Sequence, residues 1–217
     1  MVLDLEPLGD RAFLARFPTE DAARAWAATV RNRAFQGVDD VVLAYRSTAV
    51  FTDPERCDLD SLERALRTLE PRIHDAEAGA RHVVPVLYDG PDLAHVASTL
   101  SLSRDEVIDR HAGRDYHVFA VGFLPAFPYA GYLPRELSGL ARRAEPRLEV
   151  AAGSVAIAGR QTGIYPSKSP GGWHLLGRTP LRIADPEAGR FPIRAGDAIR
   201  FQPIDRHEYE ARLHERL

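Results

Sequence analysis

The chain has 217 residues, 45% of them hydrophobic and 27% charged, with a formal net charge of -3. These values are typical of a globular protein and exclude a chain that is disordered throughout. Basic residues do not gather into a surface suited to a phosphate backbone, which argues against nucleic-acid binding. Neither a signal-peptide pattern nor a run of 18 apolar residues is present, so we expect a cytoplasmic protein without a membrane span.

Residues 1–80 are predicted to form a small α/β domain. The expected elements, in order, are strands at Val2–Glu6 and Ala12–Phe17, a helix after Thr19, strands at Val41–Tyr45 and Thr48–Thr52, and a helix from Asp58 to Pro71. The order ββαββα, with two similar halves, favours a ferredoxin-like or related two-layer sandwich. Residues 75–82 are small and polar, and we place a domain boundary there.

Residues 81–217 are predicted to begin with a strand and two helices and then to become all-β. The expected elements are a strand at Val83–Tyr88, a helix from Pro91, a helix from the capping box Ser103-x-x-Glu106 to Gly113, and short strands at Tyr116–Val121, Val155–Ala158, Leu181–Ile183 and Ile199–Pro203. Short strands separated by Gly/Pro turns indicate a β-barrel or sandwich with long loops. We interpret His111 as a helix-end residue favoured by the helix dipole, not as a ligand.

The segment Gly122–Pro134 combines three prolines, two glycines and four aromatic residues in 13 positions. Pro125 and Pro128 argue against a central strand, so the segment is predicted to be a loop with a defined path. Its rings permit two interpretations: they line an apolar ligand pocket, or they pack on one another as a small satellite core. The four aromatic residues are Phe123, Phe127, Tyr129 and Tyr132.

The segment Gly153–Pro180 is rich in glycine and in hydrogen-bonding side chains. Its glycines are expected to allow close approach of the backbone to a ligand. Arg178 is suited to a carboxylate or phosphate, although a salt bridge at a strand end is the usual role of a lone Arg. His174 is a candidate acid or base, and its alternative is a histidine satisfied by backbone partners. The other candidate ligand-binding residues are Ser154, Gln161, Thr162, Tyr165 and Ser169.

Several functions are disfavoured by what these segments lack. Cys57 is the single cysteine, which excludes an internal disulfide and a Cys-based zinc cluster, and we expect no metal site. The Gly-rich segment is not a P-loop, because its glycine spacing is too long and it has no P-loop lysine. Lys168 is the only lysine and lacks the sequence context of a biotin carrier, so no biotin is expected on this chain.

The blocks of these two segments resemble those of the 5-oxoprolinase B-subunit family, which includes KipI-type and allophanate hydrolase subunit 1 proteins. The resemblance extends from about Asp4 to Ile204. Family blocks correspond, in order, to Gly122–Pro134, Pro146–Gly159, Gln161–Pro166, Ser169–Trp173 and Gly177–Pro180. The chain departs from the family pattern by having Ala126 and Ala156 where glycine is usual, which demands a negative φ or strain at those positions.

The resemblance implies an α+β protein in which a small N-terminal α/β domain is followed by a cyclophilin-like β-barrel. It implies one component, inactive alone, of an ATP-dependent enzyme that hydrolyses 5-oxo-L-proline to L-glutamate. The implied partners are the enzyme's C subunit, of the allophanate hydrolase subunit 2 type, and its A subunit, with ATP bound by this chain or by the complex. Within that interpretation we assign Arg178 to anion binding, His174 to proton transfer and Gln161 to amide recognition. The assigned substrate-binding residues are Phe123, Phe127, Tyr129, Ser154, Thr162, Tyr165 and Ser169.

Two alternatives belong to the same family. A KipI-type inhibitor of a sensor histidine kinase would need no catalytic residues, and we would expect its N-terminal domain to make the contact. A component of an allophanate hydrolase or urea carboxylase would require a biotinylated partner.

Overall fold

The computed structural model describes residues 2, 4–71 and 79–217. The chain divides into two compact units, Met1–Ala78 and Gly79–Leu217. Half of the predicted boundary segment 75–82, residues 75–78, lies outside the described residues. In the described part of the chain, no helix is long and apolar enough to cross a membrane.

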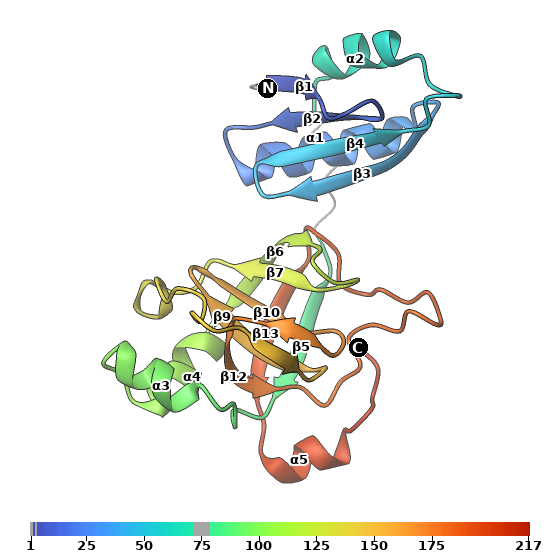
Figure 1. Cartoon of the computed structure of the whole chain (residues 1–217). Helices are drawn as coiled ribbons and strands as arrows, with labels where there is room; N and C mark the ends of the chain where they lie inside the picture. Colours follow the sequence, from blue (N-terminus) through green and yellow to red (C-terminus); the bar gives the residue numbers. More distant parts are fainter. Residues whose placement is uncertain (1, 3, 72–78) are drawn as a thin grey trace. The chain divides into compact units, whose positions relative to one another are not determined.

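The first unit is a four-stranded antiparallel sheet with two helices (Figure 1). Its elements are β1 (Asp4–Pro7), β2 (Ala12–Arg16), α1 (Glu20–Arg33), β3 (Val38–Ala44), β4 (Ser47–Thr52) and α2 (Leu59–Arg67). The strand order is β1-β2-β4-β3. Helix α1 begins at Thr19, whose side chain accepts a hydrogen bond from the amide of Ala22, and it buries Trp26 completely. The predicted two-layer α/β unit is therefore confirmed.

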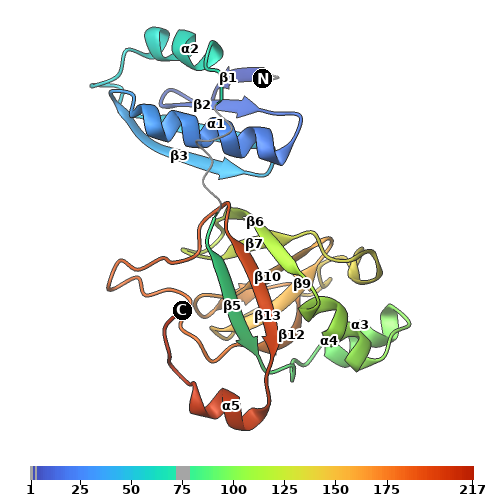
Figure 2. The same cartoon turned by 180° about the vertical axis from the view of Figure 1, so that it is seen from behind.

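The second unit is a nearly closed seven-stranded barrel with small helices at its ends, seen from both sides in Figures 1 and 2. Its elements are β5 (Arg81–Val86), α3 (Leu93–Thr99), α4 (Arg104–Ala112), β6 (Asp115–Val121), β7 (Pro128–Gly131), the 3-10 helix η2 (Arg135–Leu137), β8 (Arg147–Val150), β9 (Ser154–Ala158), β10 (Gln161–Ile164), β11 (Ser169–Gly171), β12 (His174–Arg178), β13 (Ala198–Pro203) and α5 (Arg206–Ala211). The strand order is β12-β9-β10-β7-β6-β13-β5, and only the pair β13–β5 is parallel.

The ends of this sheet meet where the chain leaves β5. The amide of Leu87 donates to the carbonyl of Arg178 at 2.9 Å, and the amide of Arg178 donates back to Leu87 at 3.0 Å. A side chain on Gly90 or on Gly177 would overlap the facing backbone, so glycine at these positions lets the two edges approach. Apolar side chains fill the interior, including Val84, Val155, Ile157, Leu176 and Phe201.

Two predictions about the barrel are wrong. Pro128 does not prevent a central strand: it is the first residue of β7, which lies between β6 and β10. A proline is tolerated at the first position of a strand. Tyr129–Gly131 then pair with β6, with a shift of register between Val118 and Ala120, and Ala130 and Gly131 pair with β10. The apolar run Leu181–Ile183 is not a strand. Its side chains Leu181 and Ile183 are buried, but its backbone makes only an isolated bridge from Arg182 to Arg216.

Candidate active site

The aromatic segment and the Gly-rich segment meet around a pocket of about 220 Å³, here called the aromatic pocket. Four predicted substrate-binding residues line it: Phe123, Phe127, Tyr129 and Tyr165. The rest of the lining is Arg142, Pro146, Pro170, Gly171, Gly172 and Trp173. The chain positions these residues through β7, through the end of β10 and through the turn that joins β11 to β12.

The rings of this pocket also form a packed cluster. Phe127 is 2% exposed and sits at its centre, edge-on to Tyr165 at 5.1 Å and to Trp173 at 5.4 Å between ring centroids. Phe123 and Tyr129 contact the same ring at 5.7 and 5.0 Å. Burial raises the pKa of the Tyr165 hydroxyl above its ordinary value. One cluster of rings is therefore at once a satellite core and the wall of a pocket, and binding of a ligand there stays a prediction. The fourth ring of the segment, Tyr132, lies elsewhere and packs on Phe119 and Arg160.

Three glycines of the Gly-rich segment are needed for close packing inside the protein, whereas the predicted approach of a ligand to the backbone stays a prediction. A side chain at Gly163 would overlap the ring of Phe127, and one at Gly171 would overlap the hydroxyl end of Tyr165. Gly177 faces the backbone that closes the barrel. Most of the Gly-rich segment is strand rather than loop, since β9 to β12 all fall within Gly153–Pro180.

A second pocket, of about 430 Å³, adjoins the segment between η2 and β8 and is here called the histidine pocket. Its lining is His95, Leu140, Ala141, Arg142, Arg143, Ala144, Glu145 and His174. Arg142 appears in both linings, so it borders both pockets. The imidazoles of His95 and His174 stack with 5.7 Å between centroids and 27° between planes.

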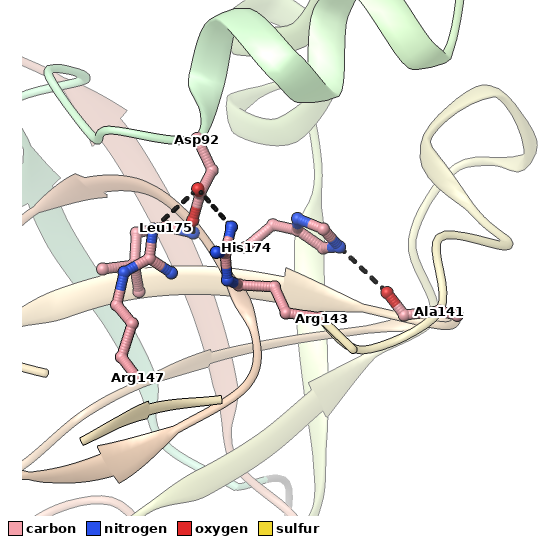
Figure 3. A network of polar contacts seen from close by, with 6 residues as sticks. All are labelled: Asp92, Ala141, Arg143, Arg147, His174 and Leu175. Carbon is pink, nitrogen blue, oxygen red and sulfur yellow. Dashed lines mark hydrogen bonds and ion pairs between the residues drawn. The ribbon is translucent and has the colours of Figure 1, made fainter. Parts of the chain in front are cut away.

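His174, the predicted acid or base, is 6% exposed at the start of β12. Its Nε2 lies 2.9 Å from the carbonyl oxygen of Ala141 (Figure 3). A carbonyl oxygen only accepts, so Nε2 is the donor in this contact. Nδ1 is buried and has no hydrogen-bond partner among the described residues. The alternative of a histidine satisfied by the backbone therefore holds for only one of its two nitrogens.

Asp92 joins the helical end of the barrel to the segment that carries Arg142, and sequence reasoning missed it. Its carboxylate accepts from Arg147 at 2.7 Å, from Arg143 at 3.2 Å and from the amide of Leu175 at 2.7 Å (Figure 3). The side chain is only 6% exposed. Burial alone would raise its pKa, but the two guanidinium groups and the amide outweigh burial and hold the pKa below its ordinary value.

Arg178 and Gln161 lie outside both linings. Arg178 donates to both carboxylate oxygens of Asp89, from Nε at 3.2 Å and from Nη2 at 2.8 Å, and its guanidinium covers the ring of Tyr209 at 4.7 Å. This is the salt bridge at a strand end that was the alternative to anion binding. Gln161 opens β10 and pairs with Gly131 and Ala158. Their catalytic roles stay predictions, and the two pockets form without them.

The three predicted hydroxyl ligands are buried, and two of them donate hydrogen bonds to the backbone. Ser154 and Ser169 are buried in β9 and β11, and Ser169 donates to the carbonyl of Pro170 at 3.1 Å. Thr162 is fully buried, donates to the carbonyl of Ala156 at 3.1 Å and lies 2.8 Å from Nε2 of His111. Ser154 and Thr162 lie on barrel strands and Ser169 lies in the separate two-stranded sheet of β11 and β8, and contact with a ligand stays a prediction for all three.

His111 does not have the role predicted for it. It is fully buried, its Nδ1 lies 2.7 Å from the hydroxyl of Tyr88, and its ring stacks on Phe201 with 4.5 Å between centroids. Burial lowers its pKa to about 3, so the ring is neutral and gains nothing from the helix dipole as a cation. It belongs to the polar centre of the barrel. Among the described residues, no group of three or more His, Cys, Asp or Glu side chains is placed to hold a metal ion.

The fold is that of a carboxyltransferase-type module. A family model described as "Carboxyltransferase domain, subdomain C and D" matches residues 3–192. The chain belongs to this family and, within it, to the group of 5-oxoprolinase B subunits, as its curated relatives show. The 5-oxoprolinase B subunit of Bacillus subtilis is 36% identical, with 95% of each chain covered. That of Escherichia coli O157:H7 is 45% identical over 72% of this chain and 73% of the relative.

Solved structures extend the comparison. The protein TTHA0988 is 39% identical with a TM-score of 0.79, and the match covers 90% of this chain but only 40% of that longer chain. Kluyveromyces lactis urea carboxylase is 17% identical with a TM-score of 0.66, covering 95% of this chain and 22% of that enzyme. The second likeness establishes the fold alone. This chain thus spans less than half of each of these two proteins, although it spans nearly the whole Bacillus relative.

Proposed function

We propose that this chain is the B subunit of an ATP-dependent 5-oxoprolinase, which opens the cyclic amide 5-oxo-L-proline to L-glutamate. The observation that carries the proposal is the identity of 35–45% to three curated proteins, each named as the B subunit of 5-oxoprolinase. The partners are the enzyme's C subunit, of the allophanate hydrolase subunit 2 type, and its A subunit. ATP has a clear chemical purpose, because an unactivated lactam is a poor electrophile and phosphorylation of its oxygen creates a leaving group.

The two pockets supply half of the required site. They offer apolar walls, one guanidinium group free of carboxylates among the described residues, Arg142, and one histidine whose buried Nδ1 has no hydrogen-bond partner there, His174. Neither lining includes Ser, Thr, Cys or Lys, the usual side chains for a covalent step. The chain is therefore inactive alone in this proposal, and a partner completes the site. Support comes from TTHA0988, in which the matched module is 40% of a longer chain.

The roles follow from the chemistry of the lining. Phe123, Tyr129 and Tyr165 provide apolar surface for the non-polar part of a ligand. Arg142 neutralises a carboxylate or a transferred phosphoryl group at the junction of the pockets. His174 accepts or relays a proton. The urea carboxylase alternative rests on a 17% identical fold, and no contact in the described residues favours kinase inhibition over catalysis.

The test is turnover by the complete complex. We would co-express the chain with the A and C subunits, purify the assembly through a tag on this chain, and measure ATP-dependent release of glutamate from 5-oxoproline. The variant Arg142→Ala removes a charge-assisted contact, and we expect kcat/KM to fall at least about tenfold. Arg104→Ala, on the exposed start of α4, is the matched control and should retain full turnover. A complex that assembles and releases no glutamate, or an Arg142 variant as active as the control, would contradict the proposal.

A further inference from the structure

A third pocket, of about 390 Å³, shares no lining residue with the aromatic pocket or the histidine pocket and is here called the basic pocket. Its lining contains three basic and three hydroxyl-bearing residues, and none of the described residues that line it is Asp or Glu. A hollow whose charged groups all have one sign concentrates ligands of the opposite sign. The six polar residues are Lys168, Arg182, His214, Ser167, Thr179 and Tyr209.

The basic pocket lies at the end of the barrel where β10 and β12 end and β9 begins. The amide of Thr179, directly after β12, donates to the carbonyl of Gly153 at 2.9 Å. The amide of Gly153, directly before β9, donates to the carbonyl of Tyr165 at 2.8 Å. These bonds hold the segment after β10, which carries Lys168, beside the segment after β12, which carries Arg182.

The C-terminal segment closes the pocket on the side of Arg182. The amide of His214 donates to the carbonyl of Pro180 at 3.1 Å, and the amide of Arg182 donates to the carbonyl of Glu215 at 2.8 Å. Arg182 and His214 therefore come from neighbouring backbone, whereas Lys168 comes from a different segment of the lining. An anion that carries charge on more than one group is suited to cations placed in this way.

The two permanent cations of the lining are accessible to a ligand. The Lys168 side chain is 68% exposed and pairs at 2.7 Å with Glu149, which is 61% exposed and lies outside the lining. An ion pair this exposed contributes little, so a more highly charged anion can displace it. The Arg182 side chain is 52% exposed and lies 3.9 Å from Asp185, whose same oxygen is closer to Arg216, at 3.1 Å.

We propose that the basic pocket binds a di- or triphosphate group, which Lys168 and Arg182 hold from two sides. Ammonium and guanidinium groups are the cations that proteins use for phosphate, and a chain of phosphates carries enough charge for both. Ser167 and Tyr209 supply hydroxyl donors in the same lining. Leu213, 44% exposed in that lining, offers apolar surface to a nucleoside. The inference goes beyond the proposed function and does not depend on lactam hydrolysis.

The first measurement is calorimetric titration of the purified full chain with inorganic tripolyphosphate, ATP and inorganic phosphate, without added magnesium. We expect tripolyphosphate to bind at least about tenfold more tightly than phosphate, and Lys168→Gln and Arg182→Gln each to weaken it by about tenfold. Glu149→Gln should tighten binding, because it removes the carboxylate that competes for Lys168. Arg104→Gln, on the exposed start of α4, is the matched control and should leave the affinity unchanged.

The second measurement locates the ligand. Lys168 is the only lysine, so reductive methylation with a 13C label marks one side chain besides the N-terminal amine and keeps its charge. The labelled resonance, assigned by its absence in Lys168→Gln, should shift as tripolyphosphate is added. A resonance that stays unmoved while calorimetry shows saturation would overturn the inference, because the anion would then bind elsewhere.

Three calorimetric results would also overturn it: no binding of either polyphosphate at about 1 mM, unchanged affinity in both Lys168→Gln and Arg182→Gln, or phosphate bound as tightly as tripolyphosphate. The comparison of ATP with tripolyphosphate distinguishes the sources of the phosphate chain. Equal affinity would support recognition of the phosphates alone, and tighter binding of ATP would support an added contact to the nucleoside. Failure of the complex to hydrolyse 5-oxoproline would leave each of these results as decisive as before.

Discussion

Removal of the Asp92 carboxylate should loosen the segment that separates the two pockets. In the Asp92→Ala variant, Arg143 and Arg147 lose their common partner, and the buried amide of Leu175 loses its acceptor. Leu175 follows His174 directly in the chain. Arg143 and Arg147 lie at the two ends of the short segment that comes after Arg142. The substitution should therefore affect both stability and the histidine pocket.

The expected loss of stability is about 3 kcal/mol. Removing one partner of a fully buried ion pair costs about 3–5 kcal/mol, because the other charge stays behind. The arginine side chains are 34% and 23% exposed and so can be partly solvated, which lowers that figure. The lost hydrogen bond to the buried amide of Leu175 adds about 1 kcal/mol. Asp92→Asn keeps one acceptor and should cost less than Asp92→Ala.

Urea unfolding followed by tryptophan fluorescence measures this loss. Trp26 and Trp173 lie in different units, so the transition that is lost in a Trp173→Phe background belongs to the barrel unit. Asp109→Ala, on an exposed face of α4, is the control and should change stability by less than about 0.5 kcal/mol. The folded-state pKa of Asp92 is lowered, so its contribution is complete above the unfolded pKa of about 3.9 and is lost as pH falls through the folded value. An Asp92→Ala barrel as stable as the control at pH 7 would refute the reasoning.

Three further outcomes follow from the packing. Ala126 has a φ of 70°, so Ala126→Gly should raise stability by about 0.5–1 kcal/mol, seen as a higher Tm, whereas Ala130→Gly in buried β7 should lower it. Gly171→Ala forces a methyl group onto Tyr165 and should lower the Tm; an unchanged Tm would show that the ring can move freely. Burial lowers the pKa of His111 to about 3, so the unfolded chain binds more protons below about pH 6.5, and stability should fall there by up to about 1.4 kcal/mol per pH unit. His111→Gln should flatten that slope in urea unfolding, and an identical slope would contradict a buried neutral ring.

Local signals predicted most of the elements. Thr19 and the Ser103–Glu106 capping box begin helices because their side chains satisfy nearby amides, an effect that needs only a few residues of chain. The strand β7 was missed because the penalty of proline depends on position: Pro128 stands at the strand's first residue, where its missing N–H costs little. Whether a proline stands at the start or in the middle of a strand depends on how strands distant in sequence pair, which the local sequence does not reveal.

The candidate site was predicted in part. Phe123, Phe127, Tyr129 and Tyr165 were correctly grouped, because large apolar rings are stabilised by burial against one another. Tyr132 was grouped with them wrongly, since it packs on Phe119. Asp92 and Arg142 were missed because each is an ordinary charged residue until the fold places Asp92 beside Leu175, which is 83 positions away along the chain. The role of Arg178 was mispredicted for the same reason, because its ion-pair partner Asp89 precedes it by 89 positions along the chain.

The proposed function is tested most directly by an omission experiment. The purified A and C subunits, ATP and 13C-labelled 5-oxoproline would be followed by NMR with and without this chain. The proposal predicts glutamate resonances only when the chain is present, and their loss when ATP is withheld. Conversion at the same rate without the chain, or no conversion with every component present, would contradict it.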